Sequence, residues 1–268
     1  MPLMINTNLA SMNAQRNTST SQNALSTAMQ RLSSGLRVNS AKDDAAGLAI
    51  GDRMNAQVKG MNVAIRNAND GISMSQTADG ALATVSDALQ RMRELAVQSA
   101  NGSNGTTDRA NLDTEFQQLA QEITDIAAQT KFNGNAIIGA GAGAQVFQVG
   151  ANVGDTLTVT TTAVTTVGGG LTTAAAANTA ITAIDTKMDA INTNRATYGA
   201  AMNRLGFASS NLQISAENQA SARSRIMDAD FAAETANLSR AQILQQAGNA
   251  MVAQANQLPN NVMALLRG

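Results

Sequence analysis

The sequence lacks cysteine, histidine and tryptophan, and it has one tyrosine and five phenylalanines among 268 residues. Without cysteine there is no disulfide and no thiolate metal site, and without histidine the commonest general base is missing. Base-activated serine chemistry would need a lysine, and the only four are Lys42, Lys59, Lys131 and Lys187. We therefore expect no enzyme, no cofactor and no metal site.

Proline and charge are also scarce. Pro2 and Pro259 are the only prolines, so almost the whole chain is free to form uninterrupted helix. Eighteen basic and nineteen acidic residues leave no basic surface for a nucleic acid. No stretch has the apolar length of a cleaved signal or a membrane span, so we expect no membrane insertion. Asn, Gln, Ser and Thr replace charged residues, and such faces can be buried against neighbours without desolvating ions.

Residues 40–101 form a long amphipathic pattern. Its apolar residues recur at alternating steps of three and four: Met54, Val58, Met61, Ile65, Ala68, Ile72, then Ala78, Leu82, Val85, Leu89, Met92 and Ala96. This rhythm predicts one long helix, beginning at a capping box of Ser40 and Asp43 and ending at Asn101 and Gly102. Its internal glycines either make room for close neighbours or let the helix bend.

The rest of the chain contains segments that can pack against this long helix. A helix is expected over about 108–130, and helical rhythm returns from about residue 174 to 216. Short strands are expected at 136–138, 145–149 and 156–162, separated by glycine-rich turns at 139–143 and 150–154. The predicted fold is mainly α, a long antiparallel helical bundle or coiled coil with a β-hairpin at about 135–165 and paired chain ends.

The two chain ends carry apolar residues that nothing else in the chain covers. We expect a terminal coiled-coil domain of residues 1–42 and 228–268, and a helical rod domain of residues 43–227. Two lone helices are marginal in water, so the ends should order when other copies arrive. The candidate packing residues are Ile5, Leu9, Leu25, Met29, Leu32, Leu36, Phe231, Leu238, Leu244, Met251, Leu258, Val262 and Leu265.

Three segments resemble bacterial flagellins. Residues 32–50 (LSSGLRVNSAKDDAAGLAI) and 89–101 (LQRMRELAVQSAN) are similar to the family's N-terminal region, and residues 242–256 (QILQQAGNAMVAQAN) are similar to its C-terminal region. The resemblance implies a filament subunit for swimming motility, exported unfolded through the flagellar channel to the extracellular flagellum. Many flagellins insert large variable domains in the middle of the chain, and from this comparison we expect no separate variable outer domain here. It also implies a homopolymer, an export chaperone, a filament cap and hook–filament junction proteins as partners. A junction-type protein of the same appendage and a secreted helical adhesin remain alternatives.

The resemblance further implies recognition by host receptors. The motif sensed by a vertebrate Toll-like receptor matches Gln90, Arg91, Leu95, Gln98 and Glu115. Residues 30–51 resemble the peptide sensed by plant receptor kinases, with candidate contacts at Gln30, Leu36, Asp43, Asp44 and Leu48. From the residues themselves, Arg91 and Glu115 could simply form a surface ion pair, with Leu95 packing against a neighbouring subunit.

Overall fold

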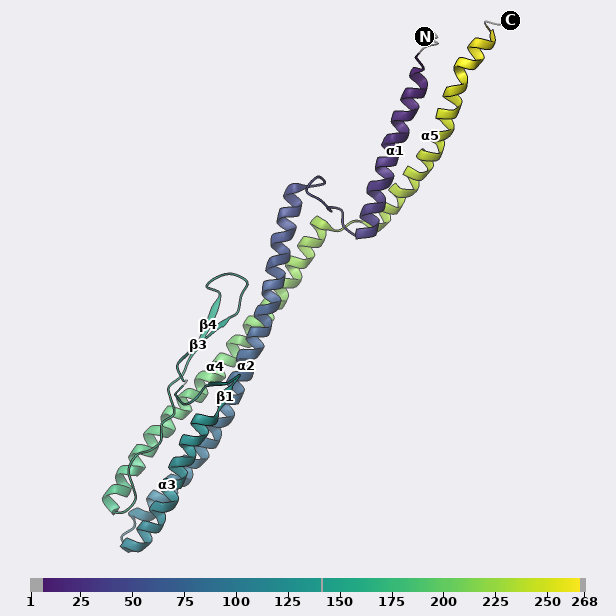
Figure 1. The fold of residues 1–268 in the computed structure, drawn as a ribbon. Coiled ribbons are helices and arrows are strands. Elements are labelled where there is room, and N and C mark those ends of the chain that lie inside the picture. Colours follow the sequence, from purple (N-terminus) through teal and green to yellow (C-terminus); the bar gives the residue numbers. More distant parts are fainter. Residues whose placement is uncertain (1–6, 141, 266–268) are drawn as a thin grey trace. The chain divides into compact units, whose positions relative to one another are not determined.

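The computed structural model describes residues 7–140 and 142–265, with side chains described as far as Gln257. Five helices account for most of this part: α1 (Leu9–Ser34), α2 (Ala45–Ala100), α3 (Thr106–Gln129), α4 (Ala174–Met227) and α5 (Phe231–Leu265) (Figure 1). Four short strands lie between α3 and α4. The predicted fold class, mainly α with a small β element, is confirmed.

The long helix begins later than the sequence indicates. Ser40 and Asp43 do interact, but they form a separate turn in which the Asp43 carboxylate accepts hydrogen bonds from the Ser40 amide and hydroxyl. The helix cap is Asp44, which accepts a hydrogen bond from the amide of Gly47 at 2.8 Å, in the first turn of α2. The predicted end is confirmed, because α2 stops at Ala100 and a turn follows.

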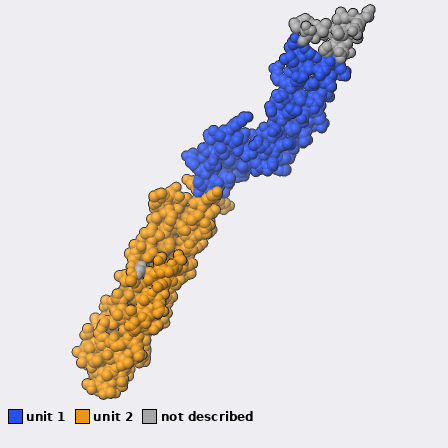
Figure 2. Space-filling view, in the orientation of Figure 1, with its two compact units in different colours: residues 1–56, 218–268 blue, residues 57–217 orange. Residues whose placement is uncertain are grey.

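The chain divides into two compact units, residues 1–56 with 218–268 and residues 57–217 (Figure 2). The expected domain limits at 42/43 and 227/228 lie in or next to the non-helical segments before α2 and after α4. The compact units instead divide inside α2 and α4. A separate terminal coiled-coil domain therefore stays a prediction.

The core of residues 57–217 lies where α2, α3 and α4 pack together. Leu82, Val85 and Met92 of α2 are fully buried, as the three-and-four spacing predicts, and Phe116 of α3 and Leu205 of α4 meet them in the same cluster. The core contains few large rings, which suits helices packed through Ala, Leu, Ile and Met. The long helix predicted to pack against the first one is thus α4.

Glycines in α2 make room for neighbouring elements. A Cβ built on Gly71 would lie 2.9 Å from Leu205 Cδ1 and 3.1 Å from Phe147 Cδ1, and one on Gly60 would lie 3.0 Å from the Cβ of Ala151. Gly80, in contrast, has open space around it. Close packing, rather than bending, is the reason for glycine at positions 60 and 71.

The β element consists of two separate antiparallel hairpins. The expected hairpin pairs β3 (Ala144–Gln148) with β4 (Thr156–Thr160) around the turn at 150–154. The other hairpin pairs β1 (Lys131–Phe132) with β2 (Asn135–Ala136), and its turn residues Asn133 and Gly134 both have positive φ. The segment 139–143 is not a hairpin turn, because β2 and β3 belong to different sheets.

Two features are absent from the described part of the chain. None of the helices has a stretch long and apolar enough to cross a bilayer. Within the same residues, no cluster of three or more acidic side chains could hold a metal ion.

Candidate assembly surface

Helices α1 and α5 pack side by side in opposite directions (Figure 1). Near the start of α1, Asn8 donates from Nδ2 to the carbonyl of Ala255 at 2.8 Å, and at the end of α1 Arg31 faces Glu234 in the first turn of α5. The two helices therefore run antiparallel along their described length. The predicted pairing of the chain ends is confirmed for these residues.

The contact face between α1 and α5, which we call the seam, is made mainly of small side chains. On α1 its buried residues are Ser11, Thr18 and Ala28, and on α5 Ala241 and Ala255 are buried. Gly248 also belongs to it, because a Cβ built there would lie 2.6 Å from Thr18 Oγ1. Small residues let the two backbones come close, but they bury little apolar area.

Several large apolar side chains of the pair lie exposed outside the seam. Among the described side chains of α1 and α5, seven large apolar ones are more than half exposed: Leu9 (66%), Met12 (56%), Met29 (53%), Phe231 (66%), Ile243 (65%), Leu244 (51%) and Met251 (63%). We call these seven residues the outward apolar residues.

The sequence-predicted packing residues fall into three groups. Leu25, Leu32 and Leu238 are half-buried and lie at helical spacing from the buried seam residues. Leu9, Met29, Phe231, Leu244 and Met251 are outward apolar residues, each more than half exposed in the described part of the chain. Ile5 and the side chains of Leu258, Val262 and Leu265 lie outside the described residues.

The apolar spacing of Leu25, Met29, Leu32 and Leu36 continues past the end of α1, so Leu36 lies outside the helix. Gly35 ends the helix in the left-handed conformation, with φ of 71°, and its amide donates to the carbonyl of Arg31. Leu36 then forms an isolated antiparallel bridge with Asp228. Glycine is favoured at this position because it adopts positive φ without steric cost, so Gly35 is a stop signal and not an interior residue of the helix.

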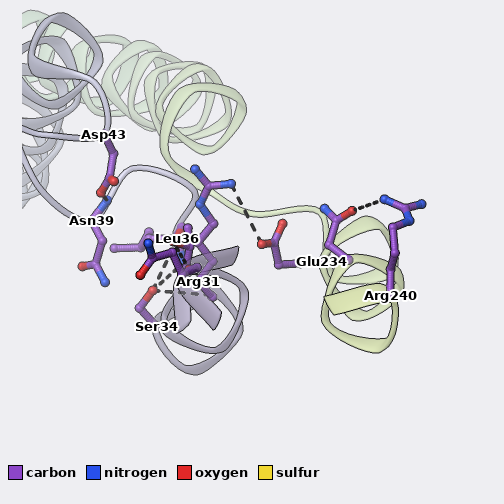
Figure 3. Close-up of polar contacts among 10 residues, drawn as sticks. Arg31, Ser34, Leu36, Asn39, Asp43, Glu234 and Arg240 are labelled. Atoms are coloured by element: carbon purple, nitrogen blue, oxygen red, sulfur yellow. Dashed lines mark hydrogen bonds and ion pairs between the residues drawn. The ribbon is translucent and has the colours of Figure 1, made fainter. Parts of the chain in front are cut away.

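A charged pair interrupts the seam near the end of α1. Arg31 and Glu234 approach to 3.9 Å, and Glu234 is only 8% exposed (Figure 3). The Nε of Arg31 is buried and has no hydrogen-bond partner among the described residues. Beside the pair lies an open groove of about 310 Å³, lined by residues of both helices that include Ala28, Arg240 and Leu244. The spacing of apolar residues did not predict this pair, because Arg31 and Glu234 are charged.

The turn that precedes α2 holds two of the expected plant-receptor contacts, Asp43 and Asp44. The Asp43 carboxyl accepts hydrogen bonds from the Ser40 hydroxyl and from the amides of Asn39 and Ser40, which together lower its pKa below 3.8. Asp44 is engaged as the cap of α2. Asp43 is exposed and fixed in orientation.

The other residues of that expected epitope differ in exposure. Gln30 is exposed, whereas Leu36 and Leu48 are half-buried. Only part of the segment 30–51 is therefore open to a partner in the folded chain.

The expected vertebrate-receptor patch spans α2 and α3. Arg91 forms ion pairs with Glu94 at 3.0 Å and with Glu115 at 2.9 Å, and the hydrogen bonds to Glu94 and to Glu115 raise the pKa of Arg91. Gln90 and Gln98 are exposed.

Leu95 does not belong to this exposed surface. It is 1% exposed and packs in the core of its own subunit, so neither its expected place in the patch nor packing against a neighbouring subunit holds. The reason is that α3 lies against α2 here, and a residue one position from the main apolar stripe is covered by the third helix.

Comparison with known proteins agrees with the resemblance. Residues 5–141 match the family described as bacterial flagellin N-terminal helical region, and residues 181–266 match its C-terminal helical region. Flagellin of Halalkalibacterium halodurans is 46% identical over 272 residues, covering 99% of this chain and all of that protein. The flagellar filament 33 kDa core protein of Treponema phagedenis is 39% identical over 286 residues, again covering 99% of this chain and all of that protein.

Among solved structures, the crystal structure of Bacillus cereus flagellin is 40% identical to this chain, with a TM-score of 0.49 over 55% of this chain and 88% of that one. The two family matches together cover most of the sequence, and the relatives match over their full length. The chain belongs to the bacterial flagellin family.

Proposed function

We propose that this flagellin is a structural subunit of the flagellar filament and that it polymerises through the outward apolar residues of α1 and α5. The observation that carries this assignment of the surface is their exposure: seven large apolar side chains lie on one helix pair whose own seam uses small residues. The named relative from Treponema is a filament core protein, which supports self-assembly as the function.

The energetics favour a second copy of the chain as the occupant. Burying the exposed part of each outward apolar residue contributes about 1 kcal/mol or more, so the set contributes on the order of 5–10 kcal/mol per subunit. The charged residues of α1 and α5 are only Arg16, Arg31, Glu234 and Arg240. A surface with so few ions can be covered from several sides without a large desolvation cost.

The test compares two double variants of α5 in polymerisation of the purified protein. Ile243→Ser with Leu244→Ser removes two outward apolar residues, and Gln242→Ser with Gln246→Ser makes the same kind of change at two exposed polar positions. The critical concentration, measured by sedimentation and checked by electron microscopy, should rise at least about tenfold for the first variant and change little for the second. Equal critical concentrations for the parent and the first variant would remove these residues from the assembly surface.

The exposed helices α1 and α5 also support proposals about export and about partner proteins. We propose that the chain passes unfolded through the flagellar export channel to the extracellular filament, with a chaperone covering α5, and that cap and hook–filament junction proteins contact the same helices. The small apolar area of the seam supports mobile ends in the monomer. Amide hydrogen exchange should therefore be fast in α1 and α5 of dilute monomer and slow in α2 and α4. Strong protection of α1 and α5 in dilute monomer would contradict this.

Host receptors are proposed as further partners. Gln90, Arg91, Gln98 and Glu115 are exposed and can contact a receptor directly, whereas Leu95 can act only by holding α2 in place. Monomer carrying Arg91→Ala and Glu115→Ala should signal more weakly through the vertebrate receptor than the parent. Arg93→Ala with Asp185→Ala breaks another exposed ion pair between helices and serves as the matched control. An equal loss for both variants would indicate a general loss of structure.

A further inference from the structure

We infer that Met12, Met29 and Met251 are an oxidation site at which peroxide blocks polymerisation of the monomer. The inference rests on the proposed function, because it requires that the outward apolar residues be covered in the filament. It concerns the chemistry of the three sulfur atoms on that surface.

Methionines are distributed unevenly in the structure. Met12, Met29 and Met251 are 56%, 53% and 63% exposed, and all three belong to α1 or α5. Among the described side chains, those of Met61, Met74, Met92 and Met227 are at most 6% exposed, and Met54, Met188 and Met202 are intermediate. The exposed thioethers are thus confined to the helix pair assigned to assembly.

The reaction at each sulfur is a two-electron oxidation by hydrogen peroxide or a related peroxide. A sulfur lone pair attacks one peroxide oxygen, the O–O bond breaks, and an S=O bond forms. The sulfur is oxidised to the sulfoxide, and the peroxide is reduced to water after the second oxygen takes up the protons. Exposure governs access, so the three outward methionines react before the buried ones.

The product changes the surface from apolar to polar. A thioether is a flexible apolar group, whereas a sulfoxide carries a strong hydrogen-bond acceptor that must lose its water when another subunit packs on it. The same oxidation should be slow in the filament, where neighbouring copies cover the sulfur atoms. Sulfoxide reduction is a known enzymatic reaction, so the block is reversible in principle.

The experiment treats the full-length monomer with hydrogen peroxide, maps the oxidised methionines by mass spectrometry and then measures the critical concentration for polymerisation. We expect sulfoxide at Met12, Met29 and Met251 before the four buried methionines, and a rise in critical concentration of about tenfold or more. Filaments treated in the same way should gain little sulfoxide at these three positions.

A variant with Met12→Leu, Met29→Leu and Met251→Leu separates this inference from the proposed function. Leucine keeps an apolar side chain of similar volume and cannot form a sulfoxide. The untreated variant should polymerise as the parent does, and peroxide should then leave its critical concentration within about twofold of the untreated value. Methionines outside the described residues are present in parent and variant alike, so the comparison isolates the three positions.

Two outcomes would overturn the inference. One is an equal loss of polymerisation in the peroxide-treated parent and leucine variant. The other is normal polymerisation of parent monomer in which the three sites are fully oxidised. Failure of the proposed function looks different, because then the serine double variant in α5 would polymerise normally whatever the state of the methionines.

Discussion

Two glycines of α2 provide a matched test of close packing in the core. Gly71 and Gly80 both lie inside the helix, so replacing either with alanine gains about 1 kcal/mol of helix propensity. They differ in surroundings: an added Cβ at position 71 would lie 2.9 Å from Leu205 and 3.1 Å from Phe147, whereas at position 80 nothing lies within 4 Å. Leu205 is fully buried and has little freedom to move away.

Overpacking of this kind costs about 1–3 kcal/mol. We expect Gly80→Ala to raise the thermal midpoint by a few degrees, and Gly71→Ala to leave it unchanged or to lower it by up to about 8 °C. Circular dichroism of the monomer measures both midpoints. Adding Phe147→Leu should recover part of any loss, because the Phe147 ring supplies two of the three atoms that the new Cβ meets, and leucine has no Cε1. Equal stabilisation by both alanines would refute the close-packing reasoning.

Three further predictions concern single side chains. Asp44→Ala removes the cap of α2 and should cost about 1 kcal/mol in denaturant unfolding, with faster hydrogen exchange at the Gly47 amide. Asn194→Ala removes a side chain that accepts from the Thr162 amide and donates to its carbonyl, so it should cost about 1–3 kcal/mol and speed exchange beyond β4. The Asp43 carboxyl should titrate below 3.8 by NMR, and because its folded pKa is depressed, the turn should be retained above pH 3.8 and lost as pH falls through the folded pKa.

Periodicity predicted the interior of residues 57–217 well. The spacing of apolar residues in α2 identified Ala68, Leu82 and Leu89 as buried, and each of them is at most 2% exposed. A long helix that packs against two others buries a wide stripe of apolar residues, and such a stripe is easily predicted from sequence. Leu95 was missed because it lies at the edge of that stripe, where burial depends on the position of α3.

Helix ends were predicted less well because they depend on local hydrogen bonds. Ser40 and Asp43 satisfy a capping pattern, yet the next carboxylate, Asp44, is the one that caps α2. Gly35 lay within an apolar rhythm that continued to Leu36, but its positive φ ends α1 before that residue. Both differences arise because several polar or flexible residues in a row offer alternative caps, and sequence spacing does not choose among them.

The chain ends show why an apolar stripe does not always identify the face that a helix buries within its own chain. Apolar residues seven apart, such as Leu244 and Met251, were predicted to pack against other copies of the chain; both are exposed, whereas Gly248 and Ala241 lie in the seam. A monomeric protein would gain nothing by placing its largest apolar side chains outside a seam of small ones. The arrangement supports the proposal that the outward apolar residues become buried in a larger assembly. Small residues in the seam then bring α1 and α5 close together, and the large residues remain free to contact other copies.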